Sequence, residues 1–94
     1  MCGIAGVLNF EQRAVDPDVL WQMTGALRHR GPEGQNIKTL SAGPVQIGLG
    51  HTRLKIIDLS DAAAQPMSNE EGSLWITFNG EIYNFRELRS ALER

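Results

Sequence analysis

Residues 1–8 read Met-Cys-Gly-Ile-Ala-Gly-Val-Leu. The small and apolar residues over 3–9 predict a buried first strand. Cys2 is the only cysteine, and it follows Met1, which is normally removed when the next residue is small. Removal would leave a thiol and a free α-amine, with a usual pKa of about 7.7–8.0, on one residue. Catalysis by an N-terminal nucleophile requires this pairing of a nucleophile with a base.

The composition is that of an ordinary globular protein, with 94 residues, 41% hydrophobic and 21% charged, and a formal net charge of −2. No apolar run approaches the ~18 residues of a membrane span, and the start lacks the basic leader of a secretory signal. A single cysteine forms no internal disulfide, so we expect a cytoplasmic location. Slight acidity without a Lys/Arg cluster argues against binding to nucleic acid or to a membrane surface.

Local patterns predict a helix that begins after Asp16, an N-cap acid, with Pro17 at the first helical position. Four apolar residues recur at helical spacing and are expected to face a core: Val19, Leu20, Met23 and Leu27. The glycine- and proline-rich loop 29–34 ends this helix.

Alternating apolar residues predict two further strands. In the first, a half-buried strand, Val45, Ile47 and Leu49 alternate with Gln46, Gly48 and Gly50. Leu54, Ile56 and Ile57 indicate that extended chain resumes beyond it, and residues 60–73 are typical of a long polar loop. In the second strand, Leu74, Ile76 and Phe78 alternate with Trp75 and Thr77 as far as Asn79-Gly80.

A second helix is predicted after Asn84, whose side chain is expected to cap it in a capping box with Glu87. Tyr83 is expected to pack on Leu88 as a hydrophobic staple, and Phe85, Leu88 and Leu92 form the apolar stripe. No glycine or proline stops this helix, which is expected to continue at Arg94. We therefore expect residues 1–94 to be the first part of a larger domain.

Five segments carry a resemblance: Met1–Gly6 (MCGIAG), Arg28–Pro32 (RHRGP), Gly50–Leu54 (GHTRL), Gln65–Met67 (QPM) and Asn79–Asn84 (NGEIYN). In this order they resemble the glutaminase domain of class II glutamine amidotransferases, most closely that of glutamine-dependent asparagine synthetases. The resemblance spans essentially the whole chain. One residue departs from the family pattern, since Glu33 stands where an aspartate usually follows Arg-Gly-Pro.

The resemblance implies that Cys2 attacks the side-chain amide of glutamine and forms a glutamyl thioester, with its own α-amine as the base. Asn79 and Gly80 would form the oxyanion hole, although Asn-Gly alone is also a common turn dipeptide. The implied binding residues for L-glutamine are Arg53, Leu54, Asn79, Gly80 and Glu81. Arg53 would bind the α-carboxylate, where the alternative is a surface arginine, and Glu81 the α-ammonium group.

The two histidines are interpreted as structural, with His51 making hydrogen bonds near the site and His29 at a helix end. One cysteine and two separated histidines give no metal-ligand spacing, so no metal site is expected. We also expect no cofactor in this chain. The resemblance assigns ATP and magnesium to a synthetase domain outside it.

The implied fold is α/β (α+β), an N-terminal-nucleophile amidohydrolase with a four-layer αββα sandwich. Residues 1–94 would be roughly its first half, the N-terminal part of a glutamine amidotransferase type 2 domain. The parent would use the released ammonia for ATP-dependent conversion of aspartate to asparagine. The alternatives are an amidotransferase for a sugar or peptide acceptor, and a non-catalytic truncated or glutamine-binding module. Alone, the fragment is expected to be inactive and to form homo-oligomers through exposed sheet edges.

Overall fold

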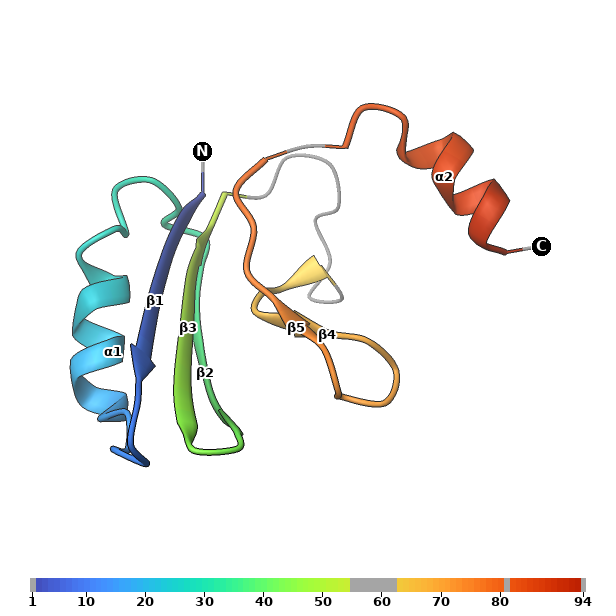
Figure 1. Ribbon diagram of the computed structural model, residues 1–94. Coiled ribbons are helices and arrows are strands. Elements are labelled where there is room, and N and C mark those ends of the chain that lie inside the picture. The colour runs from blue at the N-terminus through green and yellow to red at the C-terminus, as the bar shows by residue number, and fades with distance from the viewer. Residues whose placement is uncertain (1, 55–62, 81, 94) are drawn as a thin grey trace.

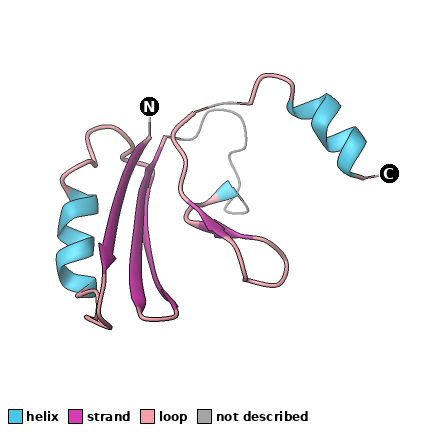
Figure 2. Ribbon diagram, viewed as in Figure 1, coloured by secondary structure: helices cyan, strands magenta, loops and turns pink. Residues whose placement is uncertain are grey.

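The computed structural model describes residues 2–54, 63–80 and 82–93. Its architecture is mixed α/β with antiparallel sheets, compatible with the expected α+β class (Figures 1 and 2). The larger sheet has the strand order β1-β3-β2 and the smaller one pairs β4 with β5. In chain order the elements are β1 (Gly3–Asn9), α1 (Pro17–Gly25), β2 (Gly34–Ala42), β3 (Val45–Arg53), β4 (Met67–Ser68), β5 (Trp75–Ile76) and α2 (Phe85–Leu92).

The register of the larger sheet brings distant parts of the chain to one end. β1 pairs antiparallel with β3 from Gly3↔Thr52 onward, and β2 pairs antiparallel with β3 from Gly34↔Arg53 onward. The starts of β1 and β2 therefore lie beside the end of β3. We call this end, next to the N-terminus in Figure 1, the Cys2 end of the sheet.

Helix α1 begins as the sequence predicts, because the Asp16 carboxylate accepts a hydrogen bond of 2.9 Å from the Asp18 N–H and Pro17 opens the helix. The predicted core-facing residues are only partly confirmed. Leu20 is fully buried, but Val19 and Met23 are 51% and 40% exposed. The helix instead buries Thr24, four residues after Leu20.

Glycines on β3 explain this choice of buried residues. A Cβ on Gly48 would lie 2.9 Å from Leu20, and one on Gly50 would overlap Thr24. The helix therefore packs directly on the β3 backbone. The buried Thr24 hydroxyl donates a 2.7 Å hydrogen bond to the Leu20 carbonyl, which satisfies it. The β3 strand is confirmed, but its glycine side, rather than its apolar side, faces the helix.

The sheet differs from the sequence-based prediction in two respects. Strand β2 was not predicted, because residues 35–42 lack a regular apolar alternation. Strand β1 was predicted to be buried, yet only its helix-facing side is covered. Ile4 and Leu8 on the opposite side are 48% and 60% exposed.

The β4–β5 hairpin and residues 77–78, which follow it, lie on the side of the sheet opposite α1 (Figure 1). The Thr77 hydroxyl donates a 3.1 Å hydrogen bond to the Gly50 carbonyl, and the Lys38 ammonium lies 4.6 Å from the centre of the Trp75 ring. The predicted strand over 74–78 is shorter, and the predicted loop contains β4. Residues 55–62, with the extended chain expected at Ile56 and Ile57, lie outside the described residues.

Helix α2 stands apart from the sheet in Figure 1. It begins after Asn84, as predicted, but the Asn84 side chain makes no capping hydrogen bond. The predicted hydrophobic staple of Tyr83 on Leu88 is also wrong, since Tyr83 is 92% exposed. The helix ends at Leu92 with Glu93 as its C-cap, and the continuation expected at Arg94 lies outside the described residues.

Across the described residues, no helix combines the length and the apolar character that crossing a membrane would require.

Because α1 rests directly on the β3 backbone, we predict that Gly50→Ala lowers the free energy of unfolding by about 1–3 kcal/mol through overpacking against Thr24. Gly6→Ala is the matched control, because the nearest atom to its added Cβ would be the Gly48 carbonyl oxygen at 3.8 Å. Urea unfolding followed by circular dichroism measures both. Equal effects of the two substitutions would contradict this account of the packing.

Candidate functional site

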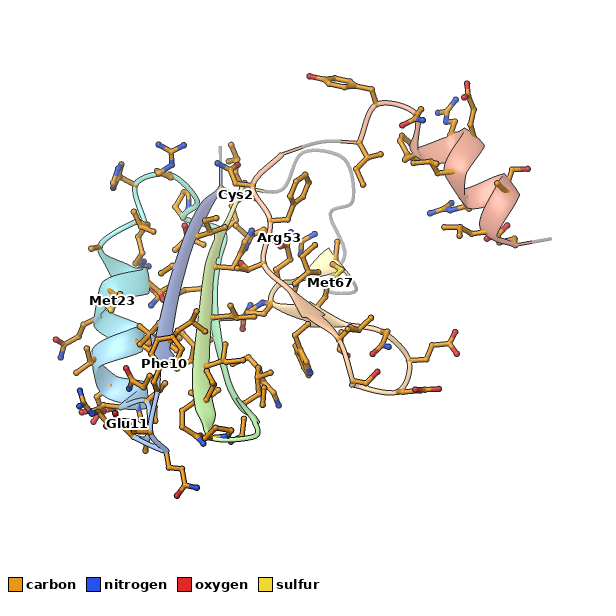
Figure 3. All side chains as sticks on the ribbon, in the orientation of Figure 1. Cys2, Phe10, Glu11, Met23, Arg53 and Met67 are labelled. Atoms are coloured by element: carbon orange, nitrogen blue, oxygen red, sulfur yellow. The ribbon has the colours of Figure 1, made fainter. Side chains whose placement is uncertain are left out.

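Cys2 lies at the start of β1, next to the end of β3. Its half-buried free thiol accepts a hydrogen bond from the Leu54 N–H, with Sγ and N 3.3 Å apart, and Sγ lies 3.8 Å from the Leu54 carbonyl oxygen. Since Gly3 pairs with Thr52, Cys2 falls opposite Arg53. Figure 3 shows both at the Cys2 end of the sheet. The structure thus brings together three of the predicted site residues: Cys2, Arg53 and Leu54.

Three hydrogen bonds hold the backbone next to Cys2. The Gly3 N–H donates to the Thr52 hydroxyl oxygen at 3.1 Å, and this hydroxyl donates to the Leu27 carbonyl at 3.1 Å. The Arg30 Nε donates to the Cys2 carbonyl at 3.2 Å. Thr52 is completely buried, so the Gly3 bond to its hydroxyl is shielded from water, whereas the Arg30 bond is exposed. The thiol therefore sits on an anchored strand rather than on a frayed terminus.

The loop before β2 packs on the backbone of Arg53. A Cβ on Gly31 would come within 2.6 Å of the Arg53 nitrogen, so this close approach requires a glycine. The Glu33 N–H donates a 3.0 Å hydrogen bond to the Arg53 carbonyl. Arg53 itself is only 6% exposed and so is buried in this structure. Its guanidinium is a positively charged bidentate donor of the kind that binds carboxylates.

Asn79 and Gly80 follow a backbone that is fastened to β3. The Phe78 carbonyl lies 3.2 Å from His51 Nε2, and the Phe78 N–H donates a 2.6 Å hydrogen bond to Gln65 Oε1. His51 precedes Arg53 by two residues on β3, so residues 79–80 leave the sheet close to its Cys2 end. Glu81, the predicted α-ammonium ligand, lies outside the described residues.

The His51 ring is 1% exposed, and its Nδ1 atom is buried with no hydrogen-bond partner in the described part of the chain. Burial lowers the pKa of His51; its hydrogen bond to Phe78 opposes this shift and the positive charge of Arg53 adds to it. The ring is therefore neutral near pH 7. No group of three or more His, Cys, Asp or Glu residues that could hold a metal ion occurs among residues 2–54, 63–80 and 82–93.

The glutamine amidotransferase domain family matches residues 1–94. The chain is also similar to the glutamine-hydrolysing asparagine synthetases 1 and 2 of Bacillus subtilis, at 41% and 36% identity over 99% and 98% of this chain. The asparagine synthetase of Brassica oleracea is 41% identical over 99% of it. This chain belongs to the glutamine amidotransferase domain family.

These matches cover a small share of each relative: 14% and 12% of the two Bacillus subtilis proteins and 15% of the Brassica oleracea protein. No solved structure gives a significant match to this chain.

Sequence reasoning missed the residues that support the site. Thr52, Gln65 and Arg30 lie within the five segments, but neither their residue types nor their spacing indicates a role. Each bonds a residue at least 13 positions away in the chain, so no local pattern predicts its partner. Their only signal is that they lie inside these segments.

We predict that Thr52→Val lowers the free energy of unfolding by about 1–3 kcal/mol, because the Gly3 N–H and the Leu27 carbonyl both lose their buried partner. Thr52→Ser keeps the hydroxyl and should cost much less. Urea unfolding of the two variants makes the comparison. If valine is tolerated as well as serine, the hydroxyl does not anchor β1.

Proposed function

We propose that this chain is the glutaminase part of a glutamine-hydrolysing amidotransferase, with Cys2 as the nucleophile. The observation that carries the proposal is the register of β1 and β3, since Gly3↔Thr52 puts the thiol beside the buried Arg53. A nucleophile and a carboxylate-binding cation at one end of a sheet fit a substrate that has an α-carboxylate at one end and a reactive amide at the other.

The proposed reaction begins when Cys2 Sγ attacks the amide carbon of L-glutamine. The α-amine of Cys2, freed by removal of Met1, takes the thiol proton. The carbonyl oxygen becomes an oxyanion that accepts hydrogen bonds from the Asn79 side-chain amide and the Gly80 N–H. When the C–N bond breaks, the protonated α-amine gives its proton to the departing ammonia and a glutamyl thioester remains. Water then attacks the thioester and releases glutamate.

Substrate recognition in this proposal uses both charged groups of glutamine. The Arg53 guanidinium pairs with the α-carboxylate and Glu81 with the α-ammonium group. Leu54, whose N–H bonds to the thiol, forms part of the pocket. Burial of Arg53 supports this role, because a carboxylate that enters the site meets a guanidinium largely shielded from water. No cofactor takes part in these steps.

For the whole protein, we propose that residues 1–94 are the N-terminal part of a longer chain that uses the ammonia for ATP-dependent conversion of aspartate to asparagine. The similarity to glutamine-hydrolysing asparagine synthetases supports this acceptor. We further propose the four-layer fold of N-terminal-nucleophile amidohydrolases. The helix on one face and the exposed Ile4 and Leu8 on the other support it, because a second sheet would bury these side chains.

In the full-length polypeptide, Cys2→Ala should abolish glutamine hydrolysis, because alanine forms no thioester. Synthesis from free ammonia should continue, since that chemistry would need no thiol. A coupled glutamate assay and an ammonia-dependent synthesis assay measure the two activities, the second serving as the folding control. Glutamine-dependent turnover that survives in Cys2→Ala would refute the proposed nucleophile.

Substitution of Arg53 and substitution of Asn79 should change different kinetic parameters. Arg53→Ala removes a contact made in the ground and transition states alike, so it should raise the KM for glutamine more than it lowers kcat. Such a contact is worth about 1.5–3 kcal/mol.

Asn79→Ala removes a hydrogen-bond donor that is needed as negative charge develops on the amide oxygen, so kcat should fall by about 10²–10³ with little change in KM. Steady-state kinetics on the full-length polypeptide separate the two patterns. An unchanged KM in Arg53→Ala, or an unchanged kcat in Asn79→Ala, would remove that residue from the mechanism.

A further inference from the structure

Two side chains from separate parts of the sequence hold the backbone of Phe78. Gln65 Oε1 accepts a 2.6 Å hydrogen bond from the Phe78 N–H, and His51 Nε2 lies 3.2 Å from the Phe78 carbonyl oxygen. This carbonyl belongs to the planar peptide unit that also contains the Asn79 nitrogen. A contact that orients the Phe78 carbonyl therefore also orients the backbone from which residues 79–80 continue.

The Phe78 carbonyl determines which nitrogen of the His51 ring carries the proton. A carbonyl oxygen only accepts hydrogen bonds, so His51 Nε2 must carry the proton and donate. In the neutral ring Nδ1 then has a lone pair, and this buried atom has no hydrogen-bond partner among residues 2–54, 63–80 and 82–93. Leaving a buried polar atom without a partner costs free energy. The hydrogen bond that the other ring nitrogen makes is to the Phe78 carbonyl, which ties the buried ring to the backbone before Asn79.

Residues 77–78 cross β3 and make hydrogen bonds to two adjacent residues of that strand, Gly50 and His51. The Thr77 hydroxyl donates to the Gly50 carbonyl at 3.1 Å, one residue before His51 on β3. Two residues after His51, the same strand carries Arg53. The rigid β3 backbone therefore links the position of the carboxylate-binding residue to the start of the proposed oxyanion loop. A site on a strand holds such a geometry more closely than a site on a free loop.

We propose that His51 and Gln65 are positioning residues for amide hydrolysis: by holding both backbone groups of Phe78 they aim the Asn79 and Gly80 donors at the developing oxyanion. This inference rests on the proposed glutaminase function. Neither residue touches substrate or takes a proton in the reaction. Both act through the peptide unit that precedes the donors. Loss of either contact should thus lower kcat while glutamine binding through Arg53 persists.

The test uses paired amide variants in the full-length polypeptide. His51→Gln places a side-chain nitrogen near the position of Nε2 and keeps the donor, whereas the shorter His51→Asn does not reach the Phe78 carbonyl. For Gln65, Gln65→Glu keeps the acceptor oxygen and Gln65→Met removes it at similar size. Steady-state glutaminase kinetics and urea unfolding are measured for all four.

We expect His51→Asn and Gln65→Met to lower kcat by about 10–100-fold, the range that misplacement of catalytic groups produces, with the KM for glutamine nearly unchanged. His51→Gln and Gln65→Glu should remain close to the parent. Equal losses within each pair, or a raised KM with kcat retained, would overturn the inference. If His51→Asn does not fold, the Gln65 pair decides. A parent polypeptide that releases no ammonia from glutamine, or a fully active Cys2→Ala variant, would instead overturn the proposed function and this inference with it.

Discussion

A chain terminus stays ordered only where its neighbours supply hydrogen bonds and packing, and here Thr52 supplies both to Gly3. The Gly3 N–H bonds to the Thr52 hydroxyl, and a Cβ on Gly3 would lie 2.7 Å from that oxygen. The register of β1 on β3 depends on this close approach. A shift by one residue would turn the Gly3 side of β1 away from Thr52 and Leu27 and move Cys2 away from Arg53.

Packing by glycine has a consequence for the rest of the molecule. Because Gly48 and Gly50 bring α1 against the backbone, Leu20 is the only fully buried large apolar side chain among the described residues. The space beneath the helix is occupied by Thr24 and Thr52, which are buried and hydrogen-bonded. The order of the Cys2 end therefore depends on directional polar contacts more than on a large apolar core, and these contacts specify geometry closely.

Much of the local structure could be predicted from the sequence, because it depends on neighbouring residues. Asp16-Pro17 begins α1, the small apolar residues over 3–9 give β1, and alternating residues give β3. Strand β2 was not predicted, since its sequence is polar and lacks apolar alternation, and its hairpin pairing with β3 compensates for this. The capping box at Asn84 fits the local pattern, yet that side chain makes no capping bond. Similarly, the segments that contain Cys2 and Arg53 were visible in the sequence, whereas their supports were not.

The topology explains why these segments stand where they do in the chain. In an antiparallel sheet ordered β1-β3-β2, one end receives the start of β1, the start of β2 and the end of β3. The segment with Cys2 precedes β1, the segment with Gly31 precedes β2, and the segment with His51 and Arg53 closes β3. The chain that follows β5 returns to the same strand through Phe78. Segments that look scattered along the sequence are therefore the parts of the chain that turn at one end of one sheet, and their spacing follows from the lengths of the elements between them.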